Sequence, residues 1–230
     1  MEITISHLTE GAQNARGIAV VIDVFRAFST ACYVFNGGAE KIVPVGAVER
    51  AFKLKKQHPD WLIMGERDER KVEGFDFGNS PSHLIDFDFS ERSVIQTTSA
   101  GTRGLVNATG AEEVLSGSFV NAAAIAAYIR KKAPEQVSLV CMGYAAEYQT
   151  EEDTFCAEYI KALLLNESVD FRKMREVIRN TAGKRFFIEK NQYFAPSADF
   201  DLCLDLNKFP FVLRLEESTE GYHFLNKLIP

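Results

Sequence analysis

The sequence predicts a layered α/β/α fold around a mixed, largely buried sheet, and three observations support this. Apolar runs of strand length recur along the chain, with helix-like segments between them, up to about residue 165. These runs lack strict alternation of apolar and polar residues, which is typical of strands buried on both faces. The 230 residues are 46% hydrophobic and 25% charged, enough material for one large core. Together these features favour a layered α/β domain.

Strands and helices are expected in regular alternation between residues 17 and 166. The expected strands are 17–25 (GIAVVIDVF), 41–45 (KIVPV), 61–66 (WLIMGE), 92–98 (RSVIQTT), 112–118 (EEVLSGS) and 136–143 (QVSLVCMG). The expected helices are 27–40, which ends at Gly37-Gly38, 46–60, which ends near Pro59, 100–110, the alanine-rich 120–135, and 150–166, which starts at Thr150.

The last part of the chain has a different character, because aromatic and acidic residues dominate it. We expect a helix followed by a small helical or strand-bearing cap on the same core. The chain is therefore predicted to be one domain over 1–230, with an α/β core over 1–165 that carries the motifs and a C-terminal extension over 166–230. The aromatic C-terminal third would either cover the core or form a homodimer surface.

Charge and composition exclude several classes of function. The formal net charge of −6 argues against a nucleic-acid partner, because binding a phosphate backbone requires a basic surface. No apolar run reaches transmembrane length, and the start of the chain lacks the pattern of a signal peptide, so we expect a cytoplasmic protein with no membrane partner. The four cysteines form no CxxC pair, which favours free buried thiols, and the four histidines form no zinc-like pair.

Polar clusters follow four of the expected strands. In doubly wound sheets ligands bind beyond the carboxyl ends of strands, so this recurrence is the strongest indication of a site. The clusters are Asp23 with Arg26, Glu66 with Arg67, the segment Thr97–Thr102, and the segment Gly143–Asp153.

Each cluster also has a purely structural interpretation. The hydroxyls and small residues of 97–102 could cradle an anion or simply cap the following helix, and the segment alone leaves these two about equal. Asp23 and Arg26 could bind a metal and a phosphate, or form an internal ion pair. Ser118 and Asn121 are better explained locally as a helix N-cap with a buried amide. The acids at 151–153 suit a helix N-terminus by charge alone, although Mg²⁺ would also accept them.

Known phosphatase, NTPase and hydrolase motifs are absent or incomplete. The segments DFDFS (86–90) and DFDLC (199–203) mimic the Asp-x-Asp of aspartyl-phosphate phosphatases. Neither follows a long apolar strand or has Thr or Val at the fifth position, so both are expected to be structural. No P-loop, nucleophile elbow or cysteine-phosphatase loop occurs.

Taken in order, six motifs resemble the 2-phosphosulfolactate phosphatase (ComB) family between about residues 17 and 165. They are DVFRAFST (23–30), GGAEKIVPV (37–45), GERDERKVEGFDFGNSP (65–81), TTSAGTRGL (97–105), LSGSFVNAAAIA (115–126) and EEDTFCAEYI (151–160). The resemblance implies a ComB-like fold distinct from other phosphatases. It also implies Mg²⁺-dependent hydrolysis of (2R)-phospho-3-sulfolactate, or a related phosphorylated 2-hydroxy acid, on the route toward coenzyme M.

The resemblance also implies site residues. The implied catalytic residues are Asp23, Arg26, Glu66, Arg67 and Asp76. The implied residues for the small anionic phosphorylated substrate are Asn79, Ser80, Thr97, Thr98, Ser99, Gly101, Thr102, Ser118 and Asn121. The implied Mg²⁺ ligands are Asp23, Glu66, Glu152 and Asp153. Two alternatives stay open: a non-catalytic binder of a phosphorylated or sulfonated metabolite, and an aspartyl-phosphate phosphatase with Asp86 as nucleophile.

Overall fold

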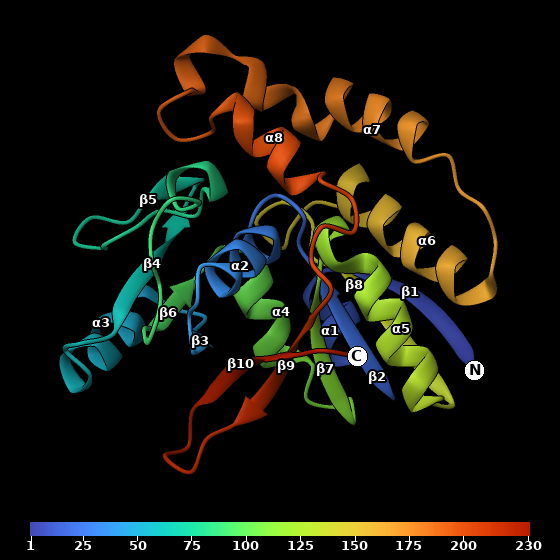
Figure 1. The fold of residues 1–230 in the computed structure, drawn as a ribbon, viewed down its shortest axis with the longest axis horizontal. Coiled ribbons are helices and arrows are strands. Elements are labelled where there is room, and N and C mark those ends of the chain that lie inside the picture. Colours follow the sequence, from blue (N-terminus) through green and yellow to red (C-terminus); the bar gives the residue numbers. More distant parts are fainter.

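The chain forms one mixed ten-stranded sheet with helices on both faces (Figure 1). This computed structural model describes residues 1–230. The strands are β1 (Glu2–His7), β2 (Ile18–Ile22), β3 (Lys41–Pro44), β4 (Leu62–Arg67), β5 (Arg70–Lys71), β6 (Ser93–Thr97), β7 (Glu113–Gly117), β8 (Gln136–Cys141), β9 (Val212–Glu217) and β10 (His223–Leu228). The α-helices are α1 (Leu8–Gln13), α2 (Ala27–Asn36), α3 (Val48–Gln57), α4 (Gly101–Asn107), α5 (Ala122–Lys132), α6 (Glu151–Leu165), α7 (Phe171–Asn180) and α8 (Ser197–Cys203). The 3₁₀ helices are η1 (Pro81–His83), η2 (Phe119–Asn121), η3 (Ala182–Phe187) and η4 (Glu189–Asn191).

The layered α/β fold with a mixed sheet, which the sequence predicts, is confirmed. Every strand and helix expected between residues 17 and 166 is present, with ends that differ by a few residues. The strand order is β1-β8-β2-β7-β9-β10-β3-β6-β4-β5. Neighbours are parallel within β1-β8-β2-β7 and within β3-β6-β4, and the antiparallel hairpin β9–β10 joins these two groups.

Residues 166–230 form part of the central sheet and of its core, in addition to packing on its surface. Their last two strands lie in the middle of the sheet, where β9 pairs with β7 and β10 meets β3 at Leu225 and Ile42. Leu213 and Leu225 are fully buried there, so the hairpin supplies core as well as pairing. Strand β1, which the sequence analysis did not anticipate, pairs in parallel with β8 over six residues.

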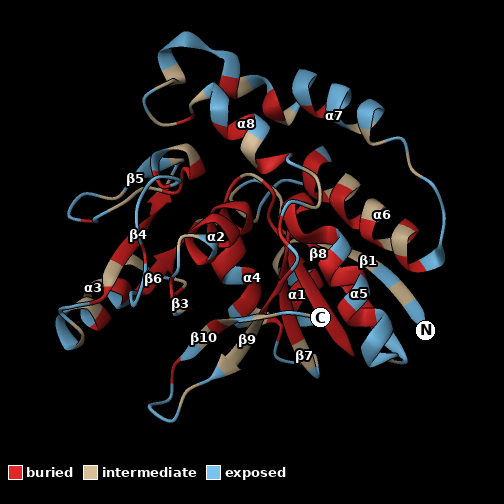
Figure 2. Cartoon of the chain, viewed as in Figure 1, coloured by how far each residue is buried: buried red, intermediate tan, exposed pale blue.

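Burial on both faces explains why the central strands lack alternation. On β2, Val20 packs in one apolar cluster with α5 and α6, while Val21 packs in another with α1, α2 and α4. All five residues of β2 are buried, as the red central strands of Figure 2 show. A third, smaller cluster holds α3 against β3, β4 and β6.

The segment 171–203 forms a cap, a name used below for α7, η3, η4 and α8 together. It passes over the ends of the strands, above α2 and α6 in Figure 1. Within it, α7 is mostly exposed, whereas Phe186 and Phe200 are buried against the core. The cap therefore covers the carboxyl ends of the strands, where the polar clusters identified in the sequence lie.

The four cysteines are free and buried, as the sequence predicts. No helix combines the length and the apolar character needed to cross a membrane.

Candidate active site

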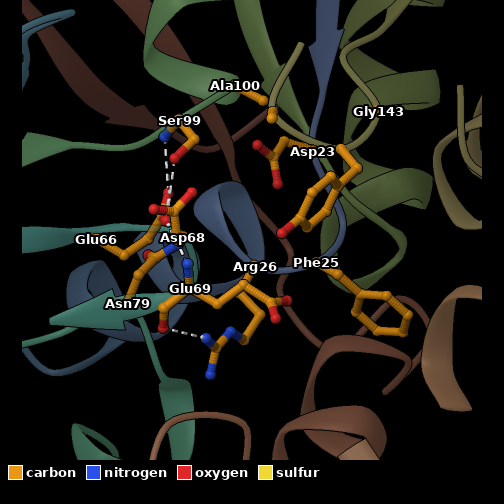
Figure 3. A pocket seen from close by; sticks show the side chains of 12 residues that line it. Asp23, Phe25, Arg26, Glu66, Asp68, Glu69, Asn79, Ser99, Ala100 and Gly143 are labelled. Atoms are coloured by element: carbon orange, nitrogen blue, oxygen red, sulfur yellow. Dashed lines mark hydrogen bonds between the residues drawn. The ribbon is translucent and has the colours of Figure 1, made fainter. Parts of the chain in front are cut away.

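The four strand-end clusters meet at one cavity (Figure 3). Asp23 follows β2, Glu66 lies at the end of β4, Ser99 follows β6 and Gly143 follows β8. The cavity is lined by Asp23, Phe25, Arg26, Glu66, Asp68, Glu69, Asn79, Ser99, Ala100, Gly143, Tyr144 and Ala145.

Asp23 is buried and held by two backbone donors. Its Oδ1 accepts a hydrogen bond from the N–H of Ala27 at 3.0 Å, and its Oδ2 accepts one from Gly101 at 2.8 Å. Burial raises the pKa of Asp23 from its ordinary 3.8 to about 6, although the Ala27 N–H opposes the shift, and the nearby charge of Glu66 adds to it. Only a residue without a side chain fits at 101, because a Cβ would lie 2.8 Å from Oδ2.

Glu66 is fixed in the same way from the opposite wall. Its Oε1 accepts from the N–H of Ser99 at 2.7 Å, and its Oε2 accepts from the Ser99 hydroxyl at 3.1 Å and from the N–H of Glu69 at 2.9 Å. Figure 3 shows Glu66 and Ser99 joined by these bonds on one side of the cavity, with Asp23 facing them. Two carboxylates on rigid supports therefore border the same space.

Two further acids lie at the start of α6, outside the lining. Asp153 is buried and accepts from the N–H groups of Val24 and Gly143, each at 2.8 Å, so it ties the end of β2 to the end of β8. Glu152 is also buried, and its Oε2 has no hydrogen-bond partner. Burial raises the pKa of Glu152 to about 7, with the positive charge of Arg185 opposing the shift, and burial together with Glu152 raises that of Asp153.

Arg26 forms a buried ion pair, but with Asp199 rather than with Asp23. Its Nη1 donates to Asp199 Oδ2 at 2.6 Å and to the carbonyl of Phe194 at 2.7 Å, while Nη2 donates to the carbonyl of Glu69 at 3.2 Å. Ser80 donates to the same Asp199 carboxylate. The DFDLC segment is thus structural, as expected, and it anchors the cap to a cavity residue.

The hydroxyl-rich segment 97–102 is mainly a helix cap. The N–H of Thr98 donates to Thr102 Oγ1 at 3.0 Å, and the N–H of Thr102 donates to Thr98 Oγ1 at 3.1 Å. Thr97 accepts from Arg67 Nη2 at 2.8 Å. Of the whole segment, only Ser99 and Ala100 line the cavity, while the hydroxyls of Thr98 and Thr102 are used in their mutual bonds and that of Thr97 in the bond from Arg67.

Several expected site residues lie elsewhere. Asp76 accepts from the N–H of Ile63 and lies 3.9 Å from Lys55, outside the cavity. Ser118 and Asn121 form a reciprocal N-cap at η2, which is the local interpretation of that motif. The expected residues that line the cavity are Asp23, Arg26, Glu66, Asn79 and Ser99, and those that do not are Arg67, Asp76, Ser80, Thr97, Thr98, Gly101, Thr102, Ser118, Asn121, Glu152 and Asp153.

Sequence reasoning missed two charged residues that meet at the edge of the cavity. Glu69 lies inside a motif that was singled out, but the motif alone gave it no role. Arg185 belongs to the cap, and its Nε lies 2.5 Å from Glu69 Oε1. Nothing local in KRFF, residues 184–187, indicates this long-range pairing.

The carboxylates do not form a closed metal cage. No three His, Cys, Asp or Glu side chains of the chain converge on one point, and both oxygens of Asp23, Glu66 and Asp153 accept hydrogen bonds from N–H groups. The expected four-carboxylate set is therefore not assembled as such. Mg²⁺, however, binds through one or two carboxylates together with waters and substrate phosphate. Asp23 and Glu66 in the wall, with the unpartnered Oε2 of Glu152 nearby, fit that mode of binding.

Comparisons with known proteins agree with the geometry. A family model described as 2-phosphosulpholactate phosphatase matches residues 3–218. Three similar proteins are each named "Probable 2-phosphosulfolactate phosphatase". The protein from Bacillus subtilis (strain 168) is 30% identical over 204 residues, which are 88% of this chain and 89% of the relative. The one from Caldicellulosiruptor saccharolyticus is 37% identical over 174 residues, 73% and 72% of the two chains. The one from Caldanaerobacter subterraneus is 30% identical over 210 residues, which are 86% of this chain and 87% of the relative.

The family match spans nearly the whole chain, including every strand end that borders the cavity. This chain therefore belongs to the 2-phosphosulfolactate phosphatase family and is a phosphoric monoester hydrolase.

Proposed function

We propose that this chain hydrolyses (2R)-phospho-3-sulfolactate to 3-sulfolactate and phosphate, with Mg²⁺ as cofactor. The observation that supports this most is the cavity at the four strand ends, where Asp23 and Glu66 face each other on rigid supports. The substrate is the one in the names of the relatives.

Asp23 and Glu66 would hold the cation, with Glu152 adding negative charge behind them. The unpartnered Glu152 Oε2 and the raised pKa values of Asp23 and Glu152, both caused mainly by burial, support a cation here. When bound, Mg²⁺ supplies positive charge that stabilises the phosphoryl oxygens.

The chain's own residues would bind the phosphoryl group and move the protons. Arg26 lines the cavity, and its Nε makes no hydrogen bond within the chain. In the reaction a water oxygen bonds to phosphorus, the ester P–O bond breaks, and the leaving oxygen gains the proton that the water loses. Asp68 lines the cavity, is exposed, and has a carboxylate without a hydrogen bond to the chain, so it is the acid best able to exchange that proton.

The decisive experiment is phosphate release from phosphosulfolactate, phospholactate, phosphoglycolate and phosphoglycerate, with Mg²⁺ and with EDTA. We expect Mg²⁺-dependent release that is fastest for phosphosulfolactate, and a loss of about 100-fold or more in Glu66→Gln. Asp86→Asn is the matched acid-to-amide control, because Asp86 is exposed and lies outside the cavity.

Other outcomes would select the alternatives. Binding of phosphosulfolactate without phosphate release would identify a non-catalytic binder. Loss of activity in Asp86→Asn would identify an aspartyl-phosphate phosphatase. A flat substrate profile would contradict the sulfonate preference.

A further inference from the structure

The cavity supplies less positive charge than its proposed substrate requires. Four of the lining residues are acids, and the only lining cation is Arg26, which is already paired with Asp199. The proposed substrate carries a phosphate, a carboxylate and a sulfonate. One bound cation would serve the phosphate, and this leaves the more distant anionic groups without a partner.

Arg185 is an additional cation beside the cavity, and it comes from the cap. Its Nε lies 2.5 Å from Glu69, and its Nη2 donates to the carbonyl of Phe25 at 3.4 Å; Glu69 and Phe25 both line the cavity. The side chains of Arg185 and Glu69 are each 18% exposed, so neither is sealed in the core. Arg185 therefore lies on the cap side of the cavity, beside Glu69 and Phe25.

The turn between β4 and β5 holds Glu69 against Arg185. Asp68 and Glu69 have φ angles of 50° and 65°, a left-handed conformation that is unfavourable for residues other than glycine. The backbone of Glu69 is fixed on both sides, since its N–H donates to Glu66 and its carbonyl accepts from Arg26. Only its carboxylate is left to meet Arg185.

We propose that Arg185 binds the sulfonate of the substrate, and that in the free enzyme the Glu69 carboxylate occupies the place of that sulfonate. A guanidinium binds carboxylate and sulfonate oxygens through the same charge-assisted hydrogen bonds. Binding then exchanges one anion for another at Arg185, and Glu69 turns toward solvent. This inference rests on the proposed function, because it assumes a phosphorylated hydroxy acid in the cavity.

The test compares phosphosulfolactate with phospholactate, which keeps the phosphate and the carboxylate but lacks the sulfonate. In Arg185→Gln, KM for phosphosulfolactate should rise about 10- to 100-fold with little change in kcat, the range expected for losing a charged hydrogen bond. KM for phospholactate should change less than about twofold. Arg185→Lys should lie between the wild type and Arg185→Gln, because it keeps the charge but loses the planar fork.

Glu69→Gln provides a second test, in which KM for phosphosulfolactate should change in the opposite direction. It removes the competing charge, so KM for phosphosulfolactate should fall, and this result keeps the test decisive even if Arg185→Gln does not fold. Arg175→Gln is the matched control, since Arg175 is also an ion-paired cap arginine but contacts the exposed Asp201 away from the cavity. Its KM values should match those of the wild type.

The two proposals fail in distinguishable ways. If the wild type releases phosphate from none of these substrates, the proposed function is wrong. If the wild type is active but Arg185→Gln raises both KM values equally, or neither, the assignment of Arg185 to the sulfonate is wrong.

Discussion

Three buried carboxylates at the site each accept a hydrogen bond from a backbone N–H that is distant in sequence, as well as one from nearer in the chain. Asp23 joins the start of α2 to the start of α4, Glu66 joins β4 to Ser99, and Asp153 joins the ends of β2 and β8. A carboxylate with such partners is stabilised in its charged form, which offsets part of the cost of burying it. Each acid therefore positions backbone, and Asp23 and Glu66 also line the cavity.

Gly101 is the residue at which this support is most sensitive to substitution. In Gly101→Ala the new Cβ would lie 2.8 Å from Asp23 Oδ2 and 2.8 Å from the Cβ of Ala27, so the carboxylate or the helix must move. We expect a loss of about 1–3 kcal/mol of stability and a fall in kcat/KM of about 10-fold or more through misplaced Asp23. Phosphate release and urea unfolding would measure both.

Gly46→Ala is the control for this substitution. A Cβ at position 46 would have only Val106 near it, at 4.0 Å, so stability and activity should both stay close to those of the wild type. Wild-type activity in Gly101→Ala would contradict the role given to this contact.

At the scale of elements, one buried ion pair between Asp199 of α8 and Arg26 attaches the cap to the site. Arg26 and Asp199 lie 2.6 Å apart, with side chains 3% and 0% exposed. Asp199→Ala would leave the Arg26 charge buried without its acid, so we expect a loss of about 3–5 kcal/mol in the free energy of unfolding. Asp201→Ala on the same helix breaks an exposed pair with Arg175 and should cost less than about 1 kcal/mol. Urea unfolding of both variants measures the difference, and equal losses would contradict the anchoring role of Asp199.

The sequence predicts local elements well because their signals are local. The strand at 18–22 and the helix at 122–132 follow from apolar runs and alanine content, and the caps formed by Thr98 with Thr102 and by Ser118 with Asn121 follow from polar residues at helix starts. Convergence of the four strand ends also follows from a general property of such sheets.

Long-range pairing has no such local signal. The alternating sequence of β9 and β10 suits a hairpin, but nothing in it indicates an insertion between β7 and β3. Likewise the pairing of Arg26 with Asp199 spans 173 positions, and Glu69 meets Arg185 only once the cap has folded over the sheet. The motif residues identify the position of the site, whereas the cap that completes it depends on tertiary packing.

At the scale of the whole molecule, the net charge of −6 includes a buried acidic cluster at the strand ends, formed by Asp23, Glu152 and Asp153. Burial raises the pKa of each of these acids most; the charge of Asp23 adds to the shift of Glu152 and Asp153, and the charge of Glu66 adds to that of Asp23. Without a cation, ionising this cluster at neutral pH opposes folding, so stability should depend on both pH and divalent cations.

In protein treated with EDTA, we expect the free energy of unfolding to fall as the pH rises from about 5 to about 8. A carboxyl whose pKa is higher in the folded than in the unfolded chain binds its proton more tightly when folded. Its stabilising effect is therefore complete below the unfolded pKa, and is lost as the pH rises through about 6 for Asp23 and about 7 for Glu152. For Asp23 the shift from 3.8 to about 6 corresponds to about 3 kcal/mol at most.

Urea unfolding across this pH range would measure how steeply stability falls with pH. Glu152→Gln should flatten this slope, whereas Glu151→Gln, at an exposed position of the same helix, should leave it unchanged. If Mg²⁺ is the cofactor, as proposed above, it should restore stability most at the high end of the range, where the carboxylates that would bind it are ionised. A stability that rises with pH in EDTA would contradict a buried cluster held together by protons or a cation.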